Sequence, residues 1–300
     1  DNPRAVQINL EALSAQHIFV CGASGTGKTY FLMLFLMRSL TMEKKRIIYI
    51  TPKADEGTNH LNVVKYFNGC LIELGRDKSK NINPFEIFTS KNITRDNAEG
   101  VFYQHVDILK NFFMALILSE TTGRDNMIPY LERTIHETYE NKGIYLEDLT
   151  SWHDWPYLSD IFTIWETEKD MNVTAEALYN KSGSIMTSWK YLNAPSNIDL
   201  TNDFIVFDTS GMRSGTDKLQ DAYNVLITGM MGMRFKENKM KKTIICVDEG
   251  RVFLQNPQIA AFLMRTLMEG RSAGIGLVIA VQQPSDLQKA NVAEEMKTNI

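Results

Sequence analysis

Apolar residues along this chain follow one pattern at its two ends and another in its middle. Short apolar runs rich in β-branched residues, typical of buried strands, recur at residues 18–21, 46–50, 70–74, 202–208, 243–247 and 276–281. Stretches of helical composition or spacing lie between them, chiefly at residues 30–37, 61–67, 218–238 and 257–270. Strands that alternate with helices predict a mainly parallel sheet with helices on both faces. A further amphipathic piece, residues 6–10, is interpreted as an edge strand.

Between residues 90 and 198 the spacing of apolar residues becomes helical. They recur at threes and fours in three stretches, at residues 101–117, 128–139 and 158–165. Gly143 and Pro156 interrupt the pattern, so five or six helices are predicted. We therefore expect an α/β core formed by residues 1–89 and 199–300 and interrupted by an all-α inserted domain at residues 90–198.

The aromatic residues of the middle segment have two readings. Its four tryptophans fall at core-like helical spacing, which predicts packing residues: they are Trp152, Trp155, Trp165 and Trp189. A platform on which nucleic-acid bases stack is the open alternative. The five histidines of the chain are scattered without ligand spacing, so they are interpreted as structural or surface residues.

The first strand, loop and helix carry the clearest chemistry. The loop reads Gly22-Ala-Ser-Gly25-Thr-Gly27-Lys28-Thr29, the G-x-x-x-x-G-K-T pattern of a phosphate-binding loop. Its glycines let backbone N–H groups turn toward phosphate oxygens, and the following helix adds the positive end of its dipole. Lys28 is predicted to contact the β- and γ-phosphates and Thr29 to bind Mg²⁺. The predicted nucleotide-binding residues are Gly22, Ala23, Ser24, Gly25, Thr26, Gly27, Lys28 and Thr29.

A carboxylate at the end of a neighbouring strand is expected to complete the metal site. The run at residues 243–247 ends in Asp248-Glu249, whereas the run at 202–208 ends in Asp208 followed by Thr-Ser-Gly. Four apolar residues before an Asp-Glu pair favour the strand at residues 243–247 as the source of this carboxylate. Asp248 is predicted to orient the metal shell and Glu249 to act as the general base on the attacking water. Asp208 is interpreted as a structural residue or as a cap for the turn that follows it.

Two further positions complete the predicted catalytic set. Gln283 follows the last strand, on the sheet edge that carries the phosphate-binding loop, and is predicted to sense the γ-phosphate or position water. A merely polar strand exit is its alternative reading. Arg271 follows Gly270, a predicted helix end, and is preferred over Arg265 as an arginine finger acting on a neighbouring subunit. An exposed helix-end arginine is the other reading of this residue.

Composition and charge limit the partners and the cellular compartment that this chain is expected to have. The net charge of −4, from 36 acidic and 32 basic residues, provides no overall basic field for nucleic acid. Three widely separated cysteines have neither disulfide nor zinc spacing, which fits a reducing, cytoplasmic compartment. The apolar runs are too short to span a bilayer. Because the chain begins at Asp1 without a signal peptide, we expect a fragment of a longer protein, with any membrane association through regions or partners outside it.

These motifs together resemble the HerA/FtsK group of RecA-like motor ATPases. Within that group the chain is most similar to the C-terminal motor domain of the VirB-four-type ATPases of conjugative type IV secretion systems. Two segments resemble signatures of this family, Asn81-Ile-Asn-Pro-Phe85 and Gly270-Arg-Ser-Ala-Gly274 with the glutamine-bearing strand behind it. The segment Asp248-Glu-Gly-Arg251 departs from the family's Ala-Trp continuation after the Asp-Glu pair.

The resemblance implies a RecA-like P-loop core that hydrolyses Mg-ATP, with Lys28, Glu249, Gln283 and Arg271 as the catalytic residues. It further implies a homo-hexamer with shared active sites, other subunits of a type IV secretion system as partners, and a place at the cytoplasmic face of the inner or only membrane. Two rival functions stay open. One is a DNA translocase or coupling protein of the same superfamily, and the other is a nucleotide-gated assembly module with little turnover.

Overall fold

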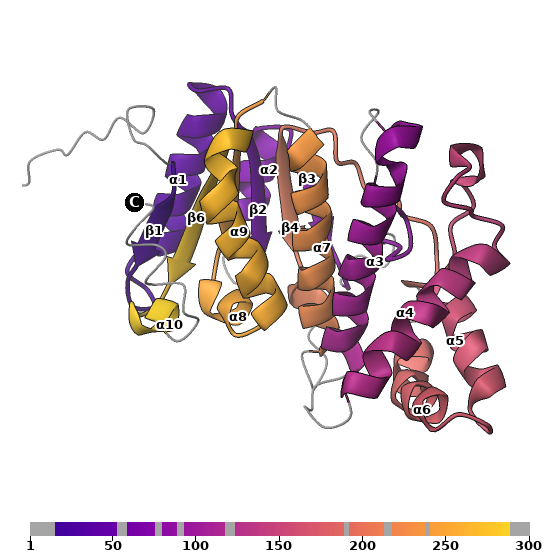
Figure 1. Cartoon of the computed structure of the whole chain (residues 1–300). Helices are drawn as coiled ribbons and strands as arrows, with labels where there is room; N and C mark the ends of the chain where they lie inside the picture. Colours follow the sequence, from indigo (N-terminus) through magenta and orange to yellow (C-terminus); the bar gives the residue numbers. More distant parts are fainter. Residues whose placement is uncertain are drawn as a thin grey trace, which may run out of the picture.

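The computed structural model describes residues 16–52, 59–75, 80–88, 93–117, 124–188, 192–212, 218–237 and 241–288 (Figure 1). The edge strand predicted at residues 6–10 lies outside these ranges, as does Trp189. Among the described helices, none is both long enough and apolar enough to cross a membrane.

A parallel sheet forms the centre of the described structure. Its strands are β1 (Ile18–Cys21), β2 (Arg46–Thr51), β3 (Cys70–Glu73), β4 (Phe204–Asp208), β5 (Thr243–Val247) and β6 (Ile275–Val281). They lie in the order β1-β6-β5-β2-β4-β3, and every neighbouring pair is parallel. The predicted parallel sheet is therefore confirmed, with each strand where its apolar run placed it.

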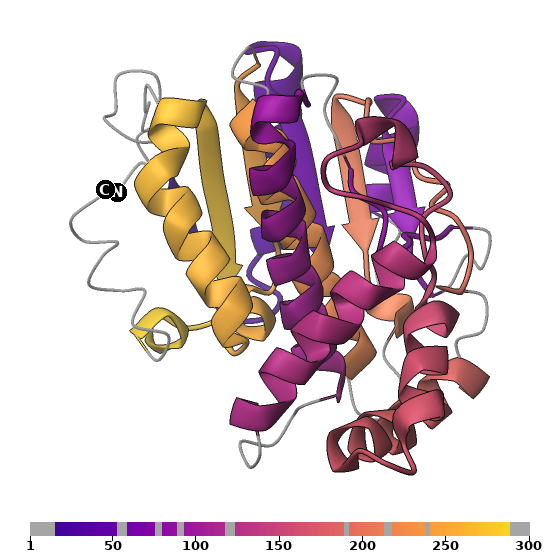
Figure 2. The same ribbon diagram turned by 45° about the vertical axis from the view of Figure 1, so that its right-hand side comes forward.

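The two faces of the sheet are buried by different helices (Figures 1 and 2). On one face, α1 (Lys28–Thr41) and α2 (Asn59–Tyr66) pack over alternate strand residues such as Tyr49 and Cys246. On the other, α3 (Arg95–Ile117), α7 (Lys218–Glu237) and α9 (Pro257–Ala273) pack over the residues between, such as Ile245. Because successive strand residues point to opposite faces, continuous apolar runs supply both layers.

Helices fill most of the described part of the middle segment, as its spacing predicted. Beyond α3 these are α4 (Arg124–Asn141), α5 (Leu158–Glu168), α6 (Val173–Ser188) and the short 3-10 turn η2 (Leu149–Ser151). The helices α4, α5 and α6 lie to one side of the sheet (Figure 1), whereas α3 packs along α7 and belongs to the layer that covers the sheet. The limits of a separate inserted domain at 90–198 therefore stay a prediction.

The described tryptophans contribute to packing in this segment. Trp165 is fully buried, and its indole Nε1 donates to the Thr134 hydroxyl at 3.1 Å. Trp152 and Trp155 are half-buried and form edge or tilted ring contacts with each other and with Phe102 and Tyr139. The packing interpretation is confirmed for Trp165, whose ring has no exposed face for a base.

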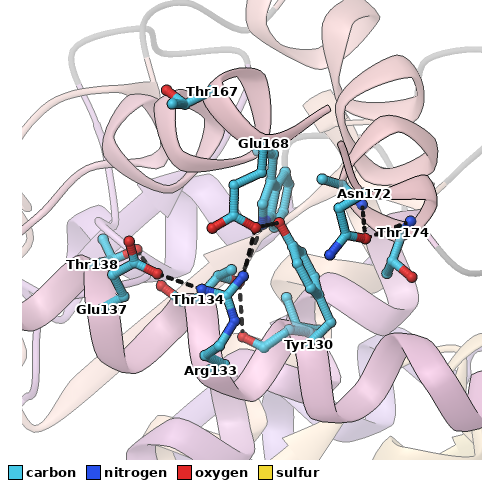
Figure 3. A network of polar contacts seen from close by, with 12 residues as sticks. Tyr130, Arg133, Thr134, Glu137, Thr138, Thr167, Glu168, Asn172 and Thr174 are labelled. Atoms are coloured by element: carbon cyan, nitrogen blue, oxygen red, sulfur yellow. Dashed lines mark hydrogen bonds and ion pairs between the residues drawn. The ribbon is translucent and has the colours of Figure 1, made fainter. Parts of the chain in front are cut away.

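A polar network at the surface holds α4 against the end of α5 (Figure 3). Arg133 contacts Glu168 at 2.6 Å and Glu137 at 2.8 Å, while the Tyr130 hydroxyl donates to Glu168 at 2.8 Å. The neighbouring guanidinium lowers the pKa of Glu168. Because Arg133 is about half exposed, solvent screens these pairs, and their main effect is to orient the two helices.

The Asn81–Phe85 segment joins the first core strands to the helical region. The Asn81 backbone N–H donates to Asn197 Oδ1 at 2.8 Å, and the Asn83 amide donates to the Pro156 carbonyl at 2.9 Å. Phe85 is fully buried, and its carbonyl accepts from the Tyr139 hydroxyl at 2.7 Å. Each asparagine thus uses its side chain or backbone to bind a segment more than 70 residues away.

The remaining short helices are η4 (Ser210–Met212), α8 (Gly250–Leu254) and α10 (Ser285–Gln288). They follow β4, β5 and β6 respectively, at the carboxyl ends of these strands. Since the loop after β1 lies at the same edge, this end of the sheet gathers the residues that the sequence singled out.

Candidate nucleotide-binding site

The loop between β1 and α1 is shaped to receive an anion. Gly27 has the left-handed backbone conformation (φ 87°) and precedes the first residue of α1. The first bond of the helix runs from the Phe31 N–H to the Gly27 carbonyl at 2.9 Å, so the N–H groups of residues 28–30 precede the helical ladder. In the described first turn there is no acidic side chain, and Gly27 provides no side-chain cap. The positive end of α1 is therefore open to phosphate.

Lys28 lies within this loop, as predicted. Its ammonium donates to the carbonyls of Gly22 at 2.6 Å and Ala23 at 2.8 Å. The Thr26 hydroxyl also donates to the Ala23 carbonyl, at 2.8 Å. The charge of Lys28 is thus held over the backbone that would surround a phosphate group.

Thr29 and Asp248 meet across the sheet edge. The Thr29 hydroxyl donates to Asp248 Oδ2 at 3.3 Å, and Asp248 is only 8% exposed. Mg²⁺ is bound in proteins by oxygen ligands, commonly one or two carboxylates together with substrate phosphates. The hydroxyl and the carboxylate fit that ligand set, and they would hold the ion beside the phosphate-binding loop.

The strand order corrects one expectation about this pair. We expected the carboxylate on a strand adjacent to the one that precedes the loop, but β6 lies between β1 and β5. The contact still forms because α1 does not stay above β1. Its buried face packs over residues of β6, β5 and β2, so its second residue, Thr29, reaches the end of β5.

Tyr49 is a site residue that sequence reasoning missed. It lies in the middle of β2 and is 1% exposed, yet its hydroxyl donates to Asp248 Oδ2 at 2.8 Å. The backbone of β2 also holds Asp248, since the Asp248 N–H donates to the Ile50 carbonyl at 3.1 Å. The only signal in the sequence was a hydroxyl-bearing ring within an otherwise aliphatic run.

Glu249 has a strained backbone. Its φ of 57° and ψ of 49° lie in the left-handed region, which costs a residue other than glycine of order 1–3 kcal/mol. Its N–H donates to Asp248 Oδ1 at 2.9 Å. The next residue, Gly250, packs so closely on β6 that an added Cβ would lie 2.4 Å from Ile279 Cγ2. This close contact accounts for a glycine at this position.

Gln282, rather than Gln283, contacts the carboxylate of Glu249. The Gln282 amide donates to Glu249 Oε1 at 2.7 Å. Gln283 lies one residue further on and is exposed, and its side-chain oxygen accepts from the Ser285 hydroxyl at 3.3 Å. Successive residues at a strand end point in opposite directions, so the sequence alone does not decide which of two consecutive glutamines faces the site. The sensor role of Gln283 stays a prediction.

Neither candidate arginine lies at this edge of its own chain. Arg271 belongs to the last turn of α9, shortly before β6 begins, and therefore lies at the opposite edge of the sheet; its side chain is outside the described part. Arg265 lines a cavity of about 890 Å³ between α3, α7 and α9, on the other face from α1. A role for either residue on a neighbouring subunit stays a prediction.

Asp208 has the structural role that the sequence suggested. It is 1% exposed at the end of β4, and its Oδ1 accepts from the Ser210 N–H at 2.8 Å, which caps the turn that follows. The two Asp-bearing strand ends thus differ in function. Of these two, the end of β5 is the one shown in the described structure to bring its carboxylate to the phosphate-binding loop, through Thr29.

These observations define an α/β fold of the RecA-like P-loop class. No family model matches the sequence, and no curated protein sequence matches it either. Among solved structures, VirB4 of Thermoanaerobacter pseudethanolicus matches with a TM-score of 0.80 and 20% identity, over 98% of this chain and 78% of that chain.

The plasmid coupling protein TrwB is a second structural relative. Its complex with the non-hydrolysable GTP analogue GDPNP matches with a TM-score of 0.51 and 14% identity, over 99% of this chain and 72% of that chain. Its complex with ADP and Mg²⁺ matches with a TM-score of 0.50 and 14% identity, over 94% of this chain and 68% of that chain. At these identities the likeness establishes the shared fold.

Proposed function

We propose that this chain is the motor domain of an ATPase that powers a conjugative type IV secretion system. The observation that carries the proposal is the 3.3 Å contact between Thr29 and Asp248, which joins the phosphate-binding loop to the Asp-Glu strand end. The fold likeness to VirB4, over 98% of the chain, supports the choice of motor. TrwB, of the same fold, binds a GTP analogue and ADP with Mg²⁺, which supports a nucleotide with Mg²⁺ as ligands here.

The proposed reaction assigns a task to each side chain. Lys28 exchanges its bonds to the loop carbonyls for bonds to phosphate oxygens, and Thr29 with Asp248 holds Mg²⁺. An ion held by these two residues would supply positive charge against the phosphates. Glu249 accepts a proton from the water that attacks the γ-phosphorus while the bond to the β–γ bridging oxygen breaks. Gln282 keeps the carboxylate of Glu249 in position through its amide.

Nucleotide binding and steady-state hydrolysis by matched variants test this function. Lys28→Ala is expected to abolish binding or turnover, because the phosphates lose their mobile cation. Glu249→Gln is expected to bind ATP normally and to hydrolyse it about a hundredfold more slowly or worse, since the amide cannot take the proton. A near-normal rate in Glu249→Gln would remove this residue from the role of base.

The same assay separates the motor from its two rivals. A several-fold rise in the rate on adding DNA would favour a DNA translocase or coupling protein, the reading that the weaker likeness to TrwB supports. Hydrolysis that is indifferent to DNA favours the secretion motor. ATP binding without hydrolysis, in this chain and in the assembled protein, would favour a nucleotide-gated assembly module.

The proposed setting follows from the same likeness. Other subunits of a type IV secretion system would be the partners, and a homo-hexamer at the cytoplasmic face of the membrane would be the working form. Co-purification with secretion-system subunits from membrane fractions, compared with the Lys28→Ala variant, tests this placement.

A further inference from the structure

An aromatic side chain stands exposed beside the phosphate-binding loop. Tyr30, the second residue after Lys28, is 76% exposed although it belongs to the first turn of α1. Its neighbours on the buried side of the helix, such as Leu32 and Met33, are at most 5% exposed. The phenol ring therefore makes no contribution to the core that could explain it.

The backbone of Tyr30 belongs to the end of α1 on which the proposed site would bind phosphates. The helical ladder begins only with the Phe31 N–H, so the N–H of Tyr30 is the last one free of that ladder. A nucleotide that lays its phosphates on these N–H groups must extend its ribose and base away from the loop. A side chain attached at this point is within reach of that end of the ligand.

Two further observations favour Tyr30 over its exposed neighbour Phe31. The Phe31 ring already stacks on Phe35, with centroids 6.4 Å apart and planes inclined by 14°. Among the described aromatic rings, none is in contact with Tyr30. Side chains on a helix lean toward its N-terminus, so the ring of Tyr30 leans toward the phosphate-binding loop.

We propose that Tyr30 is the platform on which the base of the bound nucleotide stacks. This inference rests on the proposed function of residues 22–29 as a nucleotide site and adds its base-binding part. Aromatic stacking is tolerant of base identity, because every base presents a π face. The ligand class is therefore a nucleoside triphosphate with little discrimination between adenine and guanine.

Binding measurements with and without a base test the proposal. The probes are ATP, GTP and inorganic tripolyphosphate, each with Mg²⁺, titrated calorimetrically into the unmodified chain, Tyr30→Ala and Tyr30→Phe. Tyr30→Ala is expected to weaken ATP and GTP binding about fivefold to tenfold, the low end of base–aromatic stacking, and to leave tripolyphosphate unchanged. Tyr30→Phe keeps the ring and is expected to bind all three normally.

Leu34→Ala serves as the matched control, since Leu34 is 48% exposed on the same helix one turn further from the loop. It is expected to bind all three probes normally. Unchanged ATP binding in Tyr30→Ala would overturn the proposal. So would an equal loss of tripolyphosphate binding, which would assign the residue to the phosphate loop instead.

The Lys28→Ala variant separates this inference from the proposed function. If Lys28→Ala binds all three probes as tightly as the unmodified chain, or if the unmodified chain binds none, the nucleotide site itself is rejected and the base platform with it. If Lys28→Ala loses all three while Tyr30→Ala loses none, the nucleotide site stands and only the platform is rejected.

Discussion

Asp248 is held by groups from two elements, α1 and β2, and one of these groups is a buried tyrosine hydroxyl. Oδ2 accepts from the hydroxyls of Thr29 on α1 and Tyr49 on β2, while the backbone of β2 holds its N–H. Both hydroxyls share one oxygen, so Tyr49 fixes the carboxylate whether Thr29 is bonded to it or to a metal ion. This arrangement makes Tyr49 a positioning residue.

Tyr49→Phe removes that hydroxyl and keeps the packed ring. We expect the Mg²⁺ concentration at half-saturation to rise several-fold, because the carboxylate is less well oriented for the ion. Stability should fall by about 1.5–3 kcal/mol, the usual cost of a lost hydrogen bond to a charged group. Fluorescent ADP titrated at increasing Mg²⁺, with urea unfolding in parallel, measures both effects.

Tyr139→Phe is the control for this substitution. It also deletes a buried hydroxyl, one that donates to the Phe85 carbonyl in the helical layer far along the chain from the site. It should lose stability without any change in Mg²⁺ dependence. An unchanged Mg²⁺ dependence in Tyr49→Phe would show that the Tyr49 hydroxyl contributes only to the stability of the core.

The two glutamines after β6 can be separated by kinetics. Gln282→Ala is expected to lower kcat about tenfold or more with a small change in KM, because Glu249 loses the amide that holds it. Gln283→Ala should have the smaller effect, since its side chain is exposed. Steady-state hydrolysis of both variants decides the order, and a larger loss in Gln283→Ala would restore the sequence-based choice of sensor.

At the scale of elements, one buried histidine connects α3 to the Asn81–Phe85 segment. His105 is 1% exposed, and burial lowers its pKa from 6.5 to about 4. Backbone carbonyls of Pro84 and Phe85 face it and partly offset the effect of burial. We therefore expect the junction between the first core strands and the helical layer to be destabilised by acid.

Because the folded chain keeps His105 neutral where the unfolded chain protonates it, stability is lost as the pH falls. The contribution is fully present above about pH 6.5 and disappears progressively toward pH 4, and its size is of order 3 kcal/mol. Urea unfolding at pH 7 and pH 5 measures the loss. In His105→Gln the loss over this range should be smaller, and an equal loss in both proteins would assign it to other groups.

For the whole molecule, the sequence predicted the sheet better than the site. Six continuous apolar runs predicted six strands because burial on both faces leaves a strong pattern. The order of strands within a sheet leaves no such pattern in the sequence, so the position of β6 between β1 and β5 could not be foreseen. The same limit hid Tyr49, and it left the choice between Gln282 and Gln283 open, because each depends on which strand ends face one another.

The whole-molecule arrangement also decides what an arginine can do. Arg271 lies at the edge of the sheet opposite the phosphate-binding loop of its own chain. If it completes a site, that site belongs to a neighbouring subunit, and defects in Arg271 and Glu249 should complement each other. The test uses the assembled protein, because only neighbouring copies can share a site.

Arg271→Ala and Glu249→Gln are each expected to be nearly inactive alone. Mixed in equal amounts, they should recover roughly a quarter of the normal rate, since about half of the sites carry an intact Glu249 and about half of their neighbours an intact Arg271. A mixture of Lys28→Ala with Glu249→Gln is the control and should stay inactive, because both defects fall in the same half of the site. Full activity of Arg271→Ala alone would exclude Arg271 as the arginine finger. If Arg265→Ala, mixed with Glu249→Gln, recovers activity instead, the arginine finger would be Arg265, which lines the cavity between α3, α7 and α9.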